Sequence, residues 1–286
     1  MMTAQILDGK VVAAKIKEQL KERIRILYEK NIEPHLAFIL IGENESSKIY
    51  IRNKTKSANE LGIKSTNLNL SADITEKELL EKISSLNNDD TVHGIIVQQP
   101  LPDHIDGSRI IEAVSVNKDV DGFHPFNVGL IAVGTPLFYP CTPLGIIEIL
   151  RHYGISPSGK NVVILGRSAI VGKPLALILM RKEKFMNATL TVCHTGTENI
   201  EYYTRNADIV VCAMGKTKFL KKEMIKENSV LIDVGINRVD GKITGDIDFE
   251  DVIEKCSAIT PVPGGVGPMT VAMLMANTVK AAELKV

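Results

Sequence analysis

Apolar positions in the first part of the chain switch between helical and extended spacing. From Lys10 onward they recur at every third or fourth residue, which predicts an amphipathic helix, and the apolar run over residues 35–41 predicts a buried strand. Residues 46–61 lack proline and glycine, which predicts a second helix. Residues 64–70 alternate weakly, and Thr75-Glu-Lys-Glu78 is a capping box that opens another helix. This order of strands and helices predicts an α/β domain.

The second half of the chain repeats the alternation with more β-branched residues. Four such runs are separated by helical segments, which predicts a doubly wound parallel sheet. Thr142 and Pro143 supply an N-cap and a first-turn proline for a helix that runs to about Tyr153, and a last helix is expected over residues 269–284. The four runs cover residues 161–165, 189–193, 208–213 and 229–234.

Residues 119–140 are rich in glycine and proline and show little periodicity, so we expect a loop or linker there. The chain has 286 residues, more than one ordinary domain of roughly 100 to 200 residues. We therefore expect two domains, residues 1–122 as a first α/β domain and residues 123–286 as the domain of the doubly wound sheet.

Composition removes several classes of function. Hydrophobic residues make up 44% and charged residues 24% of the chain, the balance of a globular protein. Lys plus Arg equals Asp plus Glu at 34 each, so no basic field is available for nucleic acid or an anionic membrane. Neither a targeting segment nor a membrane span is expected. The four cysteines form no Cys-x-x-Cys pair and the histidines show no zinc-site spacing, so we expect thiols in a reducing compartment, the cytoplasm, and no metal.

A glycine turn follows the run over residues 161–165. The segment Gly166-Arg-Ser-Ala-Ile-Val-Gly172 then leads into a helical run, the order in which a dinucleotide's pyrophosphate is held at a helix N-terminus. A turn that needs glycine only for its backbone would have the same pattern. In an NAD site the second strand usually ends in a carboxylate that binds the ribose 2′-OH, and no carboxylate ends the run over 189–193. Arg167, with the hydroxyls of Ser168 and Thr195, instead suits a 2′-phosphate, which favours NADP over NAD. An exposed arginine is the alternative.

Four further segments contain residues that could take part in binding or catalysis. Tyr50 and Lys54 share one helix face and could reach the same ligand, although such a pair is more often solvated. Gln98 ends a predicted parallel strand, a common place for ligand-binding groups. Asp121 could accept two N–H donors from a ligand, or it could form an Asx turn before a glycine. The glycine- and proline-rich residues 260–270 could approach a ligand or could only connect two elements.

Together these segments resemble the bifunctional methylenetetrahydrofolate dehydrogenase/cyclohydrolase family, over nearly the whole chain. Six ordered motifs carry the resemblance, which makes it far more specific than any one of them. They are Ser46 to Lys54, Gly94-Ile-Ile-Val-Gln98-Gln-Pro-Leu-Pro102, Lys118-Asp-Val-Asp121-Gly, Pro140-Cys-Thr-Pro143, Gly166-Arg-Ser-Ala-Ile-Val-Gly172-Lys-Pro and Pro261-Val-Pro-Gly-Gly-Val-Gly-Pro-Met-Thr270.

The resemblance implies a fold and an activity. An N-terminal folate-binding domain would be followed by a Rossmann-type NADP-binding domain, with the last helix packing back across the first domain, in a cytosolic homodimer. The enzyme would oxidise 5,10-methylenetetrahydrofolate to the 5,10-methenyl cation, with hydride passing to nicotinamide C4. It would then hydrolyse the cation to 10-formyltetrahydrofolate, in one-carbon metabolism and purine biosynthesis.

The resemblance also implies roles for residues. Lys54 would transfer the proton in the hydration, Tyr50 would stack on the folate, Gln98 would hold Lys54, and Asp121 would hold the pterin. Further substrate contacts would come from Pro263, Gly264 and Gly265. The cofactor would be held by Gly166, Arg167, Ser168, Ile170, Gly172, Thr195 and Ile236.

The chain departs from the family pattern in a few places. Gln99 stands where an apolar residue is more usual, residues 43–46 lack a proline, and residues 194–197 lack the usual Ser and basic residue, which affects cofactor strictness. Two rival functions remain at this point. They are a two-domain NADP oxidoreductase acting on a small hydroxy or keto acid, and a folate-binding protein without turnover.

Overall fold

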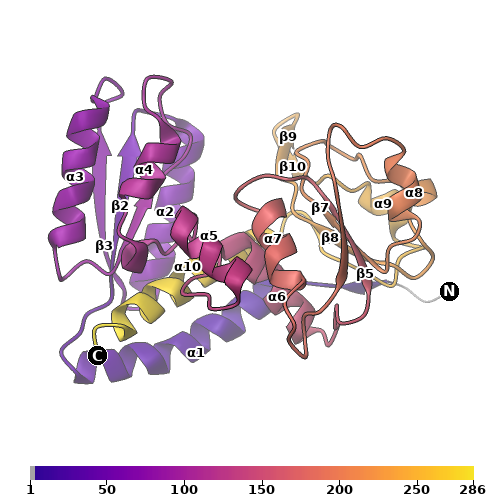
Figure 1. Cartoon of the computed structure of the whole chain (residues 1–286), viewed down its shortest axis with the longest axis horizontal. Helices are drawn as coiled ribbons and strands as arrows, with labels where there is room; N and C mark the ends of the chain where they lie inside the picture. Colours follow the sequence, from indigo (N-terminus) through magenta and orange to yellow (C-terminus); the bar gives the residue numbers. More distant parts are fainter. Residues whose placement is uncertain (1–3) are drawn as a thin grey trace. The chain divides into compact units, whose positions relative to one another are not determined.

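The computed structural model describes residues 4–286, which form two compact units (Figure 1). The first, which we call the six-stranded unit, contains the described residues up to 14 together with 142–270. The second, the three-stranded unit, contains residues 15–141 and 271–286. Each unit is therefore built from two separate stretches of chain.

The three-stranded unit is organised around a parallel sheet of order β3-β2-β4. The central strand is buried at every position, as expected for a strand covered on both faces. Helices α3 and α4 bury their apolar residues against one face, while α2 packs on β2 and β3 from the other. The elements are β2 (His35–Ile41), α2 (Glu45–Glu60), β3 (Lys64–Leu70), α3 (Glu76–Asn88), β4 (Gly94–Val97) and α4 (Gly107–Ala113).

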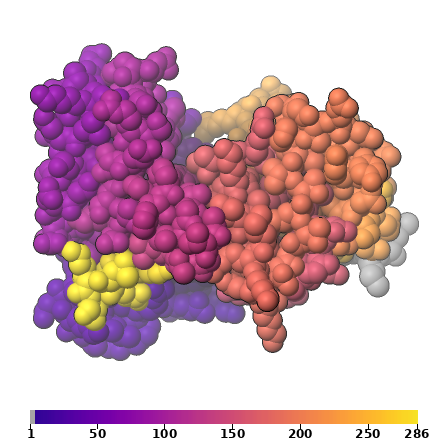
Figure 2. Space-filling model, in the orientation of Figure 1, coloured from indigo at the N-terminus to yellow at the C-terminus, as the bar shows by residue number. Residues whose placement is uncertain are grey.

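The larger parts of two long helices, residues 15–29 and 271–283, belong to the three-stranded unit. Their bounds are α1 (Gly9–Glu29) and α10 (Val266–Glu283). In α1, Arg23 forms two hydrogen bonds with the Glu283 carboxylate of α10, at 2.8 and 2.6 Å. Figure 2 shows the end of α10, in yellow, at the surface beside the indigo residues of α1. Residues far apart in sequence thus meet within this unit.

The expectation of a loop over residues 119–140 is wrong, because the helix α5 (Pro125–Val133) lies within it. The helix has ordinary ends: Pro125 is in its first turn, the His124 side chain accepts the Phe126 N–H at 3.0 Å, and Gly134 ends it with φ +92°. Its residues are apolar almost all round, so they show no polar face that would reveal a helical period. A short 3₁₀ helix, η1 (Val116–Lys118), precedes it.

The six-stranded unit confirms the doubly wound parallel sheet. Its strand order is β1-β11-β8-β7-β5-β6, and every neighbouring pair is parallel. Helices α6 and α7 cover one face and α8 and α9 the other (Figure 1). The strands are β1 (Gln5–Ile6), β5 (Asn161–Leu165), β6 (Thr189–Cys193), β7 (Ile209–Cys212), β8 (Val230–Asp233) and β11 (Ala258–Ile259), and the helices are α6 (Cys141–His152), α7 (Gly172–Leu179), α8 (Ile200–Thr204), η2 (Lys222–Met224) and α9 (Phe249–Val252).

Several smaller elements differ from the sequence-based expectation. Helix α6 begins at Cys141, so Thr142 is not its N-cap; the Thr142 hydroxyl instead lies 3.0 Å from that of Thr270. Strands β1 and β11 were not expected, because two-residue strands are too short to show a period. The antiparallel hairpin of β9 (Asn237–Val239) and β10 (Lys242–Thr244) was also missed.

Candidate active site

Helix α2 carries the predicted Tyr50 and Lys54. It begins at an N-cap, Asn44, whose side chain accepts the Ser47 N–H at 3.0 Å, and Ser47 and Ile51 bury one side of the helix. Tyr50 is 46% exposed, and the Lys54 side chain is half-buried. Lys54 does not project freely into solvent, because its Nζ donates a hydrogen bond to Gln98 Oε1 at 3.1 Å. The simple solvated-face interpretation therefore does not describe Lys54.

Gln98 lies where β4 ends, as predicted. Its backbone N–H donates to Ile39 O at 2.9 Å, which continues the ladder of the sheet by one residue. Its side-chain nitrogen donates to Gln99 O at 2.7 Å, so the amide oxygen is the atom turned toward Lys54. An acceptor held in this way fixes both the position and the orientation of the Lys54 nitrogen.

Asp121 lies in a turn whose hydrogen bonds are made by a different carboxylate. Asp119 accepts the N–H groups of Phe123 and His124 at 3.1 and 2.9 Å, together with a side-chain bond from Asn127 at 2.8 Å. The Asx-type bonds thus belong to Asp119 and leave the Asp121 carboxylate for other contacts. Burial raises the pKa of Asp121, and the positive charge of Lys54 acts against that rise. The two groups therefore share one electrostatic environment.

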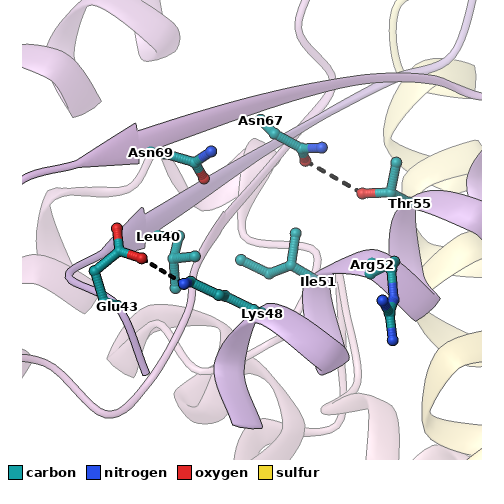
Figure 3. Close-up of a pocket in the computed structure, with 8 residues that line it drawn as sticks. All are labelled: Leu40, Glu43, Lys48, Ile51, Arg52, Thr55, Asn67 and Asn69. Atoms are coloured by element: carbon teal, nitrogen blue, oxygen red, sulfur yellow. Dashed lines mark hydrogen bonds and ion pairs between the residues drawn. The ribbon is translucent and has the colours of Figure 1, made fainter. Parts of the chain in front are cut away.

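A separate hollow of about 350 Å³ lies between α2 and strands β2 and β3 (Figure 3). Lys48, Arg52 and Thr55 line it, and they lie on a different helix face from Tyr50 and Lys54. Several of its polar groups are already paired: Lys48 forms an ion pair with Glu43, and the Thr55 hydroxyl donates to Asn67 Oδ1 at 3.2 Å. The Lys54–Gln98 pair is not part of this hollow.

The six-stranded unit holds the glycine turn between β5 and α7. Gly166 has φ +119°, and a Cβ there would lie 2.2 Å from the carbonyl oxygen of Ala213, which follows β7. A Cβ at Gly172 would lie 2.1 Å from Gly166 O, so both glycines are required by close backbone approach. Sheet order reverses between β5 and β7, and open α/β sheets bind ligands outside the strand ends at such a point.

The remaining predicted cofactor residues surround this turn within the same unit. Arg167 and Ser168 are exposed, Ile170 is 50% exposed, and Ser168 Oγ accepts the Val171 N–H at 3.1 Å. Thr195 is exposed in the loop after β6, the strand next to β5. The structure thus brings Arg167 and Thr195 to the ends of adjacent parallel strands, where a phosphate could meet both.

Two buried carboxylates that the sequence analysis missed support neighbouring loops. Asp246 accepts the N–H groups of Met214 and Gly215 at 2.6 and 2.9 Å and the Asn237 side chain at 2.8 Å. Asp233 accepts three further N–H groups, and burial raises the pKa of Asp233 to about 6. The predicted Ile236 is 50% exposed in the loop that this network holds. Each is a single aspartate at the end of a strand or in a loop, so no spacing in the sequence marks it as functional.

The loop over residues 260–265 leads into α10, which begins at Val266, and meets the start of α1 in the six-stranded unit. A Cβ on Gly9 would lie 1.9 Å from Gly265 O, and the Gly265 N–H donates to Pro261 O at 2.8 Å. Pro263 is exposed, whereas Gly264 and Gly265 are buried.

Two negative observations concern the described part of the chain. No helix in residues 4–286 is both long and apolar enough to cross a membrane. In the same residues no cluster of His, Cys, Asp and Glu has the arrangement of a metal site, and all four cysteines are free and buried.

Comparison with known proteins gives a consistent result over the whole chain. Residues 7–121 match the catalytic domain of the tetrahydrofolate dehydrogenase/cyclohydrolase family, and residues 140–286 match the NAD(P)-binding domain of that family. The bifunctional protein FolD of Campylobacter concisus is 52% identical over 283 residues, with 99% of each chain covered.

Solved structures agree with these matches. The bifunctional FolD methylenetetrahydrofolate dehydrogenase/cyclohydrolase of Campylobacter jejuni is 50% identical, with a TM-score of 0.96, covering 99% of this chain and 100% of that one. The Trypanosoma brucei dehydrogenase-cyclohydrolase, solved with NADP and an inhibitor, is 36% identical, with a TM-score of 0.94, covering 100% of this chain and 99% of that one.

Proposed function

Because the chain belongs to the tetrahydrofolate dehydrogenase/cyclohydrolase family, we propose that it performs both reactions of that family with NADP. It oxidises 5,10-methylenetetrahydrofolate to the 5,10-methenyl cation and hydrolyses that cation to 10-formyltetrahydrofolate. The observation that carries this proposal is the hydrogen bond of Lys54 Nζ to Gln98 Oε1 at 3.1 Å, in the electrostatic environment of Asp121. A folate-binding protein without turnover would not require a proton-transfer lysine held in this way, and a small-acid oxidoreductase would not require Asp121.

The oxidation depends mainly on alignment. Loss of hydride from the methylene carbon leaves the methenyl cation, and NADP, when bound, supplies the nicotinamide C4 that accepts the hydride. The protein's part is to hold the folate still, with Asp121 accepting N–H groups of the pterin and Tyr50 stacking on the folate. No side chain needs to gain or lose a proton in this step.

The hydration requires proton transfer. Water adds to the electrophilic methenyl carbon, the ring opens, and one proton is released in forming the 10-formyl product. We assign the movement of that proton to Lys54, and we assign to Gln98 the restraint of the Lys54 nitrogen. A side chain in this role typically accounts for a factor of about 10² to 10⁴ in rate.

The residues of the glycine turn fit NADP. Gly166 and Gly172 leave no room for a Cβ, which suits a backbone that approaches a pyrophosphate closely at the start of α7. Arg167, Ser168 and Thr195 are accessible at the ends of β5 and β6, and we assign the 2′-phosphate to them. The NADP complex of the Trypanosoma brucei relative supports this choice of cofactor. Ile170 and Ile236 would provide apolar contacts, and Pro263, Gly264 and Gly265 would contact substrate.

The domain assignment, the assembly and the compartment are also proposals. Residues 1–122 would supply most of the folate-binding domain and residues 123–286 most of the NADP-binding domain, with the last helix packing against the first. The protein would act as a cytoplasmic homodimer. The four free cysteines suit a reducing compartment, and sedimentation velocity would test the dimer.

The test is to mix 5,10-methylenetetrahydrofolate with NADP and follow the absorbance of the methenyl product. Lys54→Met keeps the unbranched stem and removes the nitrogen, so hydration of the methenyl cation should fall by about 10²-fold or more while folate still binds. Lys56→Met is the matched control, since the Lys56 side chain is 76% exposed on the same helix. Hydration at the parent rate in Lys54→Met would contradict the role of Lys54. No folate binding would favour the small-acid oxidoreductase, and binding without turnover would favour the folate carrier.

A further inference from the structure

The turn that carries Asp121 is held by a side chain from the far end of the chain. Asn277, in α10, is only 4% exposed. Its Nδ2 donates one hydrogen bond to Val120 O at 2.8 Å and a second to Tyr139 O at 3.0 Å. Both hydrogens of the amide are thus used to join two segments of the three-stranded unit, and one of those segments leads directly into Asp121.

The segment on the other side of Asp121 is pinned as well. Gly122 has φ +74°, and a Cβ there would lie 2.7 Å from Pro140 N and 2.9 Å from Tyr139 O. The backbone after Asp121 therefore rests directly on the backbone of residues 139–140. Because Asn277 holds Tyr139 O, it supports the turn from this side too.

Cys141 completes the arrangement. Its Sγ lies 3.4 Å from Val120 O, 3.9 Å from Asp121 Oδ1 and 3.7 Å from Asn277 Nδ2. Burial, together with the Asp121 charge, raises the pKa of the Cys141 thiol well above its usual value. The thiol therefore stays protonated near neutral pH and acts as a weak donor beside the carboxylate.

We propose that Asn277 is a positioning residue for the Asp121 carboxylate, and that it sets the affinity for folate through its two hydrogen bonds to Val120 O and Tyr139 O. The inference rests on the proposed function, in which Asp121 holds the pterin. Asn277 does not itself contact substrate. It fixes the peptide group that precedes Asp121 and the surface on which Gly122 rests, so its loss lets the carboxylate move away from the pterin.

The size of the effect follows from the sensitivity of binding to small displacements. A hydrogen bond to a charged group contributes roughly tenfold or more to binding, and a turn that loses two of its anchors can weaken the bonds that Asp121 makes to the pterin by about that factor. For Asn277→Leu, which keeps the side-chain volume but has no donor, we expect the folate KM to rise about tenfold. The NADP KM and kcat should stay within about twofold of the parent, because the glycine turn belongs to the other unit.

Thr278→Val is the matched control variant. Thr278 is the next residue of the same helix, is equally buried, and donates its hydroxyl to Leu274 O at 2.8 Å within that helix. It therefore tests the loss of a buried hydrogen bond in α10 that does not reach the Asp121 turn. Both variants should lower the melting temperature, but only Asn277→Leu should raise the folate KM.

A double-mutant cycle with Asp121→Ala separates positioning from general damage. If Asn277 acts through Asp121, the Asn277→Leu change should have little further effect on folate KM once Asp121 is alanine. Equal effects in the two backgrounds, or a parallel rise of the folate and NADP KM values, would overturn the inference. Should Asn277→Leu not fold, Asn277→Asp keeps the shape and is measured in the same way; if neither folds, the role is structural and the inference is wrong.

Different results would refute the proposed function itself. If Asp121→Ala alone leaves the folate KM unchanged, then Asp121 does not hold the pterin, whatever Asn277 does. If Asp121→Ala raises the folate KM tenfold and Asn277→Leu does not, the proposed function stands and only the role of Asn277 is refuted.

Discussion

Replacing Gly166 by alanine tests the cofactor turn without touching a charged or reactive group. The residue has φ +119°, a conformation that side-chain-bearing residues rarely adopt, and its new Cβ would lie 2.2 Å from Ala213 O. Neither atom is part of a flexible side chain. The clash can be relieved only if the turn after β5 and the segment after β7 move apart.

The magnitude follows from that separation. Carbon and oxygen atoms in real structures essentially never approach within 3.0 Å at such a Cβ, so the contact must open by about 0.8 Å. A displacement near 1 Å in a positioning element can cost about 10²-fold, or roughly 2.7 kcal/mol. We therefore expect kcat/KM for NADP-dependent oxidation to fall about 100-fold in Gly166→Ala.

Hydration of the methenyl cation should be nearly unchanged in the same variant, because Lys54, Gln98 and Asp121 belong to the other unit. Both activities are measured on one preparation, and the free enzyme is titrated with NADP. Gly129→Ala is the control, since a Cβ at Gly129 has nothing within 4 Å. An unchanged NADP affinity, or an equal loss of both activities, would refute the reasoning from the glycine contact.

Three further results are expected. Arg167→Ala should weaken the binding of NADP far more than that of NAD, because only NADP carries the 2′-phosphate. High salt should likewise lower the parent's ratio of kcat/KM for NADP to kcat/KM for NAD. If this ratio is unchanged in Arg167→Ala, the assignment of Arg167 is wrong. Asp119→Ala should lower the free energy of unfolding by about 2 to 4 kcal/mol, measured by urea titration, because the N–H groups of Phe123 and His124 lose their acceptor. His93 has its pKa lowered to about 4, chiefly by burial. The unfolded chain therefore binds more protons between pH 6.5 and 4, and stability falls by about 3 kcal/mol as pH drops through that window. His93→Gln should lose that much less stability over the same window, and an NMR titration that places the His93 pKa near 6.5 would refute this.

Much of the fold could be predicted because the strands are marked by runs of apolar residues. The strand over residues 35–41 is apolar at all but its first position, and it is buried at every position as the central strand of its sheet. Helix α5 could not be recognised in this way, since a helix without a polar face has no period to detect. Its end signals, Pro125 and Gly134, are equally typical of a loop.

In the candidate site, too, some features could be predicted from the sequence and others could not. Tyr50 and Lys54 could be selected as a pair by spacing, but spacing could not show that Gln98 holds Lys54, because 44 residues separate the two partners. The turn at residues 119–122 contains two aspartates, and only the folded structure shows that Asp119, not Asp121, accepts the hydrogen bonds that stabilise the turn. Asn277 lies 157 residues from Val120, and a buried asparagine in a helix gives no sequence pattern at all.

Because each unit is built from two separate stretches of chain, neither unit can be completed until late in synthesis. During synthesis, the residues that form the three-stranded sheet leave the ribosome well before residue 277, and at ~5–20 residues per second the delay from residue 141 is roughly 7 to 27 s. Throughout that interval the two hydrogen bonds from Asn277 to Val120 O and Tyr139 O are missing, so in the nascent chain the Asp121 turn has only the contacts made within residues 119–141. The strand β1 likewise waits for β11 before it can pair. Folate should therefore stabilise this nascent chain only weakly until α10 emerges.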